Sequence, residues 1–167
     1  MGNFIIHFKG FHLKIKLIAL GDKMPAWINE GFKTYAARMP SDYQLELIEV
    51  PLFKRSKNTH PSVAMQKECE SLLTFIKPTD YIVALDKNGK EFSSEKLASI
   101  LQKLHDESKT LVLLIGGPDG LTQELLKKTH ENWSLSKLTL PHALARIVTA
   151  EQLYRAYSII AHHPYHR

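Results

Sequence analysis

The last five residues of this 167-residue chain, His163-Pro164-Tyr165-His166-Arg167, bring together side chains with distinct chemical abilities. An imidazole such as that of His166 can accept a proton near neutral pH. The guanidinium of Arg167 can hold a phosphate through two hydrogen bonds, and the ring of Tyr165 can stack on a base. We therefore expect Tyr165, His166 and Arg167 to meet an anionic or planar substrate. The alternative is a terminal segment that frays and has no role.

The histidines of this tail are a weaker candidate for a metal site. His163 and His166 would supply two ligands, whereas zinc sites use three or four protein ligands. The single cysteine, Cys69, falls on the apolar side of an expected helix, and the chain has no HExxH pattern. We therefore expect no metal, and we expect Cys69 to be a small buried side chain rather than a nucleophile.

A second candidate site is the glycine turn, residues 116–120, with the sequence Gly-Gly-Pro-Asp-Gly. It follows an expected strand and precedes an expected helix, which is where open α/β sheets bind ligands. Gly116 and Gly117 would let the backbone approach a small molecule closely. The turn matches neither the dinucleotide-binding fingerprint nor the P-loop, and a plain tight turn is the alternative.

The elements that must position these residues alternate between strands and helices. Two of the strands are apolar throughout, which is typical of a parallel sheet that is covered on both faces. We expect one α/β domain with strands at 14–20, 45–50, 81–85, 111–115 and 135–140, and with helices at 25–39, 61–77, 94–104, 122–130 and 142–162.

The final helix, residues 142–162, carries apolar side chains on both of its sides. Leu144 and Ile147 lie on one side, and Leu153 and Tyr157 lie on the other. A surface helix normally has a single apolar stripe. We therefore expect this helix to pack both on its own sheet and on a second copy of the chain in a homodimer.

Composition limits the classes to which the protein can belong. Hydrophobic residues make up 44% and charged residues 23%, as in globular domains, and the formal net charge is +5. One cysteine excludes an intramolecular disulfide and favours a reducing compartment, so we expect a cytoplasmic protein. No apolar run is long enough to span a membrane. The basic cluster Lys54, Arg55 and Lys57 favours phosphate contacts, with a solvated loop as the alternative.

Taken together, these motifs resemble the H family of ribosomal RNA large-subunit methyltransferases, a bacterial branch of the SPOUT superfamily. The resemblance rests on the order and spacing of short motifs from residue 14 to Arg167, and leaves an N-terminal extension, residues 1–13, of unknown role. The residues that carry it are 20–25, Trp27, 54–58, 114–120, 133–136, 138–142 and 163–167.

The resemblance implies a fold and an activity that the residue patterns alone do not. It implies a C-terminal trefoil knot, a homodimer, and S-adenosylmethionine bound in the knot. It also implies methylation of N3 of a pseudouridine in the large-subunit (23S) ribosomal RNA of the assembled ribosome. By position, the cofactor pocket would use Leu85, Gly116, Gly117, Ser136, Lys137, Leu138, Thr139, Leu140 and Pro141.

Under the same resemblance, His166 is the candidate general base, while Tyr165 and Arg167 order the target loop. Arg155, on the final helix, would anchor RNA or brace the tail, unless it only forms an i,i+4 pair with Glu151. Two alternatives stay open, an RNA-binding protein without activity and a methyltransferase with another target base. The sequence also leaves open which subunit's tail completes each site.

Overall fold

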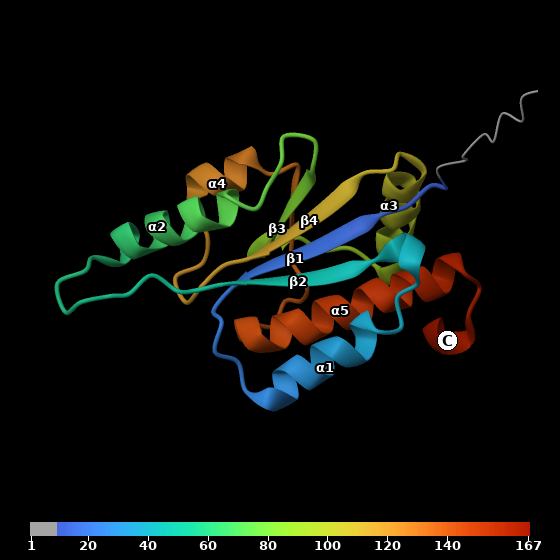
Figure 1. Ribbon diagram of the computed structural model, residues 1–167, viewed down its shortest axis with the longest axis horizontal. Coiled ribbons are helices and arrows are strands. Elements are labelled where there is room, and N and C mark those ends of the chain that lie inside the picture. Colours follow the sequence, from blue (N-terminus) through green and yellow to red (C-terminus); the bar gives the residue numbers. More distant parts are fainter. Residues whose placement is uncertain (1–9) are drawn as a thin grey trace, which may run out of the picture.

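The computed structural model describes residues 10–167, so most of the N-terminal extension, residues 1–9, lies outside the described residues. Five strands form one sheet in the order β2-β1-β4-β3-β5, and every neighbouring pair is parallel (Figure 1). The strands are β1 Lys14–Leu20, β2 Leu45–Val50, β3 Tyr81–Lys90, β4 Thr110–Ile115 and β5 Glu131–Trp133.

The central strands are buried on both faces, as their continuous apolar sequences predict. In β1, Ile15 and Leu17 belong to one hydrophobic core, whereas Ile18 and Leu20 belong to another. In β4, Leu113 and Leu114 divide between the two cores in the same way. Successive side chains of a strand point to opposite faces, so each of these strands supplies both cores.

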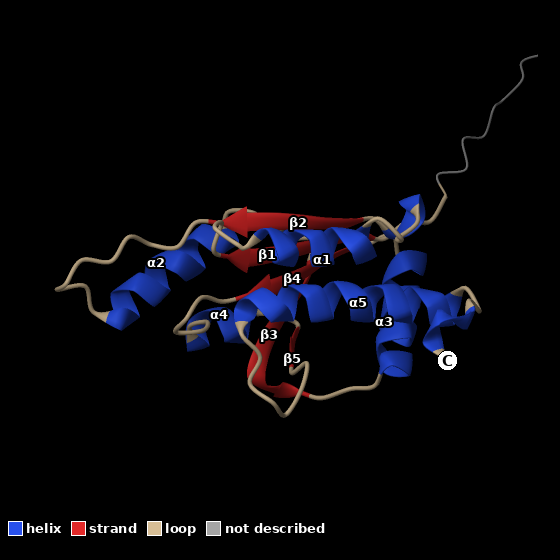
Figure 2. Cartoon of the chain, turned by 90° about the horizontal axis from the view of Figure 1, so that it is seen from below, coloured by secondary structure: helices blue, strands red, loops and turns tan. Residues whose placement is uncertain are grey.

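Helices cover both faces of the sheet, and the expected doubly covered parallel sheet is confirmed (Figure 2). One face carries α1, α3 and α5, and the other carries α2 and α4. The helices are α1 Ala26–Ala36, α2 Pro61–Leu73, α3 Ser94–Asp106, α4 Gln123–Lys128 and α5 His142–Ile160, with short 3-10 turns at Ser41–Tyr43 and Pro164–His166.

The surroundings of α5 account for part of its unusual apolarity. The helix packs against α1 and α3 as well as against the sheet, so much of its second apolar side is covered within the same chain. Ala150, Leu153 and Ala156 are buried there, whereas Leu144 stays exposed. The apolar residues on the second side of α5 therefore do not by themselves require a second copy of the chain.

One expected element is wrong. Residues 135–140 form a loop, and the last strand is β5, a few residues earlier. In the loop, the Ser134 hydroxyl donates to the carbonyl oxygen of Ser136 at 2.9 Å, and the amide of Leu138 donates to the Ser136 hydroxyl at 2.9 Å. Such local side-chain bonds offer the backbone an alternative to a strand ladder, which the apolar spacing of the leucines conceals.

Both ends of the described chain are tied to the domain. Leu13, which we assigned to the N-terminal extension, is buried, and its amide donates to the carbonyl oxygen of Asp42. The tail forms a 3-10 turn at Pro164–His166 that contacts α5. The trefoil knot implied by the resemblance stays a prediction.

Candidate functional site

A cavity of about 540 Å³ lies at the carboxyl ends of β3, β4 and β5. The carboxyl-terminal half of β3 and the segments that follow β4 and β5 surround it. Eight of the nine predicted cofactor-binding residues line it, and Lys137 is the one that does not. The eight are Leu85, Gly116, Gly117, Ser136, Leu138, Thr139, Leu140 and Pro141.

The glycine turn forms one wall of the cavity and is tightly closed. The amide of Gly120 donates to the carbonyl oxygen of Gly117 at 2.9 Å, and Gly120 has a φ of 80°. A Cβ atom on Gly116 would lie 2.8 Å from the backbone carbonyl carbon of Gly120. The turn therefore needs glycine for its own geometry, whatever ligand it meets.

Gly117 is constrained from behind the turn. A Cβ atom there would lie 3.1 Å from Oε2 of Glu68 and 3.1 Å from a methyl group of Leu52. A valine at this position would therefore disturb these neighbours as well as the cavity. Leu138, which is 75% exposed at the cavity, is a cleaner position at which to block it.

Several cavity residues were missed by the sequence analysis. Asp86 and Asn88 line the cavity, and the amide of Asn88 donates to Oδ1 of Asp86 at 2.8 Å. We interpreted this segment as the break that ends a strand, which is wrong, because β3 continues through it to Lys90. Ligands bind at the carboxyl ends of parallel strands, so the position of Asp86 near the expected end of this strand was the available signal. Asp119, Ser134 and His142 line the cavity as well.

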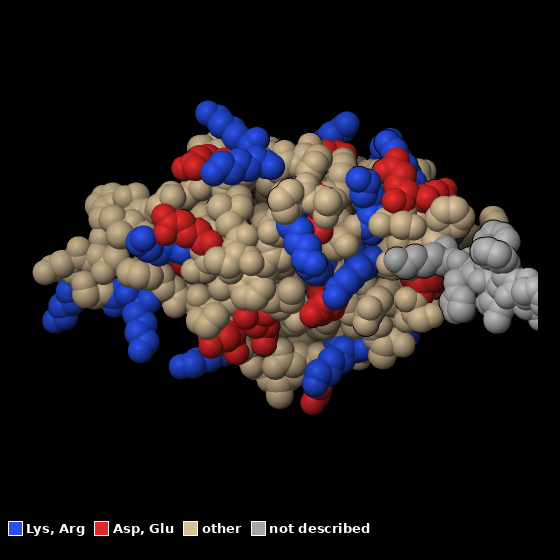
Figure 3. Space-filling view, turned by 45° about the horizontal axis from the view of Figure 1, so that its top comes forward, with Lys and Arg blue, Asp and Glu red and all other residues tan. Residues whose placement is uncertain are grey.

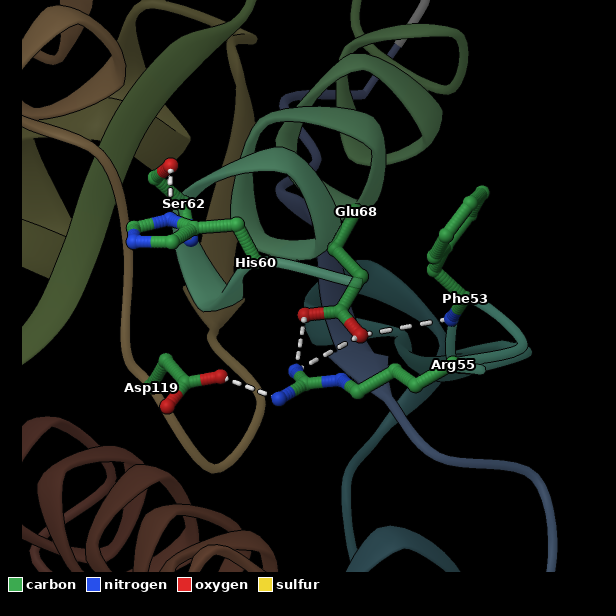
Figure 4. A network of polar contacts seen from close by, with 6 residues as sticks. All are labelled: Phe53, Arg55, His60, Ser62, Glu68 and Asp119. Atoms are coloured by element: carbon green, nitrogen blue, oxygen red, sulfur yellow. Dashed lines mark hydrogen bonds and ion pairs between the residues drawn. The ribbon is translucent and has the colours of Figure 1, made fainter. Parts of the chain in front are cut away.

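The basic loop before α2 holds three residues predicted to contact phosphate, and one of them, Arg55, has partners within the protein. The Arg55 guanidinium is engaged within the protein, since it donates to Asp119 at 2.5 Å and to Glu68 at 3.3 Å (Figure 4). The hydrogen bond to Asp119 raises the pKa of Arg55 above its ordinary value. Lys54 and Lys57 are exposed and stay candidates for phosphate contacts.

The tail is docked on α5 through Tyr165. Its hydroxyl donates to Oε1 of Glu151 at 3.1 Å, and the Arg155 guanidinium lies 4.9 Å from the centre of its ring. Burial, together with hydrogen bonds that include the one to Glu151, raises the pKa of Tyr165 to about 12. Arg155 forms the i,i+4 pair with Glu151 that we gave as the alternative, at 2.6 Å, and it also donates to the carbonyl oxygen of Tyr165 in the tail at 3.4 Å.

His166 has a defined orientation although it is exposed. Its Nδ1 lies 2.5 Å from the carbonyl oxygen of His163. A carbonyl oxygen can only accept, so Nδ1 carries the proton and donates it. The lone pair of the neutral ring is then on Nε2, which is free of this contact and able to take a proton from a substrate.

The tail and the cavity lie at opposite ends of α5 (Figure 1). Pro141, His142 and Ala145 at the start of the helix line the cavity, and the tail follows its last residue, Ile160. A helix of 19 residues is about 28 Å long at 1.5 Å per residue. One chain therefore does not bring its own predicted catalytic residues to its own cavity.

A buried arginine was also missed. Arg146 of α5 is fully buried and pairs with Glu49 of β2 at 2.6 Å. It also donates to the carbonyl oxygens of Leu20 and Gly21, at the end of β1. These bonds fix the start of α5, which lines the cavity, to two strand ends. Charged residues on helices are normally exposed, so the sequence does not indicate that Arg146 is buried or that it anchors the start of α5.

The remaining charges form no single basic surface on the face shown in Figure 3, where basic and acidic side chains are interspersed. Within residues 10–167, no three His, Cys, Asp or Glu side chains are grouped so that they could hold a metal ion. In the same range, no helix is long and apolar enough to cross a membrane.

Comparison with known proteins gives consistent matches in sequence. A family model described as a predicted SPOUT methyltransferase matches residues 13–166. A protein of Dichelobacter nodosus is 47% identical over 93% of this chain and 99% of its own length. One of Coxiella burnetii is 46% identical over 93% of this chain and 100% of its own length. Both are named ribosomal RNA large subunit methyltransferase H.

Solved structures show the same fold at low sequence identity. A probable methyltransferase from Bordetella pertussis Tohama I matches with a TM-score of 0.56 and 16% identity, over 87% of this chain and 95% of that one. A putative methylase family protein from Neisseria gonorrhoeae has a TM-score of 0.52 and 12% identity, over 98% of this chain and 99% of that one.

Proposed function

The chain belongs to the SPOUT methyltransferase family, and we propose that it methylates N3 of a pseudouridine in the large-subunit ribosomal RNA. The family takes its methyl group from S-adenosylmethionine. The ribosomal RNA substrate is supported by the relatives from Dichelobacter nodosus and Coxiella burnetii, which match along almost their whole length and carry that substrate in their names.

The observation that carries the proposal is the cavity at the carboxyl ends of β3, β4 and β5. Its volume of about 540 Å³ suits one small ligand. Leu85, Leu138 and Leu140 offer apolar surface for a purine, while Ser136 and Thr139 offer hydroxyl groups for a ribose. S-adenosylmethionine has these parts, so the residues present fit it. When bound, it supplies an electrophilic methyl group.

The tail supplies the proton chemistry that such a transfer needs. Uracil N3 carries a proton, which must leave as the new N–C bond forms. We assign this proton to Nε2 of His166, because Nδ1 is held by the carbonyl oxygen of His163. Tyr165 is docked on α5 through its hydroxyl and its ring, so it fixes the position of His166 rather than exchanging protons.

A second copy of the chain is needed to bring the tail to a cavity. The two lie at opposite ends of α5, and a helix is too stiff to close that distance. Trp27 of α1 is 56% exposed and Leu144 of α5 is 36% exposed, both near the start of helices that run side by side (Figure 1). We propose that this surface takes part in a homodimer whose two α5 helices run antiparallel, so that the tail of one copy completes the cavity of the other.

The target is proposed to be the ribosomal particle rather than free RNA. Residues 10–167 form one sheet with its covering helices, and no part of them stands apart as an RNA-binding domain, so shape and the surroundings of the target must supply much of the recognition. Lys54 and Lys57 would contribute phosphate contacts that position the substrate without reading its sequence.

The experiment that tests the proposal is methyl transfer from labelled S-adenosylmethionine to ribosomes that lack this modification. We expect label on N3 of a pseudouridine in the large-subunit RNA. Label on another base would contradict the target and keep the methyltransferase. If the protein binds S-adenosylmethionine but transfers no label, the proposal fails in favour of an RNA-binding protein without activity.

A further inference from the structure

We propose that Arg55 is a positioning residue for the cofactor cavity, and that it acts by tying the glycine turn to a buried carboxylate, that of Glu68. Arg55 stands between Asp119 of the turn and Glu68 of α2 (Figure 4). The inference rests on the proposed function only for the identity of the ligand, S-adenosylmethionine. It assigns a cofactor-related role to a residue of the basic loop that we had assigned to phosphate contacts.

Glu68 is the buried member of this network, and the protein holds its carboxylate in place. Its side chain is only 1% exposed, although it sits on a helix among polar neighbours. The amide of Phe53 donates to its Oε1 at 3.2 Å, and Arg55 donates to both of its oxygens, at 3.3 and 3.4 Å. A carboxylate is rarely buried unless it is paired. The burial of Glu68 is therefore explained by the loop that folds back over it.

Arg55 connects Glu68 to the wall of the cavity. One guanidinium nitrogen, Nη2, meets Glu68, and the other, Nη1, meets the carboxylate of Asp119. Asp119 lines the cavity, whereas Arg55 and Glu68 do not. The planar guanidinium has donors in a fixed arrangement, so it holds two carboxylates at a set separation. Arg55 thus acts on the cavity through Asp119.

A second contact joins the same two parts. Gly117 lies so close to Glu68 that a Cβ atom would be 3.1 Å from its Oε2. The back of the turn therefore rests on the carboxylate to which Arg55 is bound. If Arg55 is removed, Glu68 and Asp119 lose their shared cation. Their mutual repulsion is then unopposed, and the turn is free to move away from α2.

The arrangement also links the basic loop to the cavity. Lys54 and Lys57, the candidates for phosphate contacts, flank Arg55 in the sequence and are exposed. Arg55 is the member of this cluster whose side chain points back to the body of the protein (Figure 4). A change in the loop position therefore reaches Asp119 of the glycine turn through the side chain of Arg55.

A double-mutant cycle on the dissociation constant for S-adenosylmethionine, measured by isothermal titration calorimetry, tests the proposal. We expect Arg55→Met to weaken binding roughly tenfold, the loss of a charge-assisted hydrogen bond. In an Asp119→Ala background, the same change should cost at most about twofold, because its partner is already gone. Lys67→Met is the matched control, since among residues 10–167 Lys67 of α2 pairs with exposed Glu70, away from the network, and its loss should leave the constant unchanged.

Two results would overturn the proposal: wild-type affinity in Arg55→Met, or an equal loss in both backgrounds. Arg55→Lys keeps the charge but not the planar fork, so we expect it to restore only part of the affinity. If Arg55→Met does not fold, Arg55→Lys completes the same cycle, with the same criterion. The proposed function fails separately, since in that case the unsubstituted protein would not bind S-adenosylmethionine.

Discussion

His166 is the tail residue whose geometry best suits proton transfer, because a carbonyl oxygen fixes which ring nitrogen is basic. We expect His166→Ala to lower turnover on ribosomes by about 10²- to 10⁴-fold, the range for the loss of a general base. The affinity for S-adenosylmethionine should change much less, since His166 is assigned to the proton of the RNA base and the tail forms no part of the cavity wall within its own chain.

His162→Asn is the matched control for this change. His162 is an exposed neighbour with a φ of 54°, a conformation that asparagine also adopts readily. The His162→Asn variant should retain wild-type turnover. Comparable turnover in His166→Ala and His162→Asn would remove His166 as the base.

Tyr165 differs from His166 in that it cannot exchange its proton at working pH. Burial and its hydrogen bonds raise the pKa of Tyr165 to about 12, so the phenol is neutral below pH 10. We therefore expect Tyr165→Phe to leave the shape of the pH–rate profile unchanged between about pH 6 and 9. A shifted midpoint in steady-state rates would mean that Tyr165 titrates in the mechanism.

Among the elements, α5 depends most on a single buried side chain. Arg146 joins it to β1 and β2 through Glu49 and two backbone carbonyl groups. We expect Arg146→Met to lower the free energy of unfolding in urea by about 3 kcal/mol, because the carbonyl groups of Leu20 and Gly21 lose their donor in a buried place. Lys14→Met, which breaks an exposed pair with Glu46, should cost less than about 1 kcal/mol. Similar losses in both variants would contradict the account of Arg146.

Glu131 of the short strand β5 accepts a hydrogen bond from Tyr81 of β3 at 2.7 Å, which joins the two strands, and another from Trp133 of its own strand at 2.8 Å. Burial alone would raise the pKa of Glu131, but these bonds outweigh it and lower the pKa below its ordinary value. The stabilisation is therefore present above the pKa of the unfolded carboxyl group. It is lost as the pH falls through the lower pKa of the folded state.

We expect Glu131→Gln to cost about 1–2 kcal/mol of the free energy of unfolding at pH 7 and less at pH 3. Urea unfolding at the two pH values measures this difference. A loss that is the same at both values would mean that the charge of Glu131 contributes nothing.

The sequence predicted the elements where local pattern and tertiary packing agree. The boundaries of β1 and β2 were correct to the residue, and Thr122 caps α4 as its residue type indicates. The loop at 135–140 was misread, because serine side chains satisfy backbone groups there and two of its leucines, Leu138 and Leu140, line the cavity rather than pack in a core.

The network behind the glycine turn is a second feature that could not be predicted from the sequence. The partners Arg55, Glu68 and Asp119 come from three separate segments, and nothing in their spacing joins them. Arg146 and Glu49 are 97 positions apart and equally unforeseen. Long-range pairs of charges arise from the packing of the elements, which residue patterns do not specify.

For the whole molecule, the distance between cavity and tail is the decisive feature. Both were singled out from sequence, yet the structure places them at opposite ends of α5. A site that uses both must then be shared between two copies. Light scattering should give about twice the 19.1 kDa mass of one chain at working concentrations.

The most direct test of this central claim is activity in mixed dimers of two inactive variants. Leu138→Arg should block the cavity and His166→Ala should remove the base, so each homodimer is inactive. Refolded together in equal amounts, half of the dimers are mixed, and each has one complete site. We predict about a quarter of the wild-type methyl transfer. No recovery, with mixed dimers confirmed by mass, would contradict a site built from the cavity of one copy and the tail of the other.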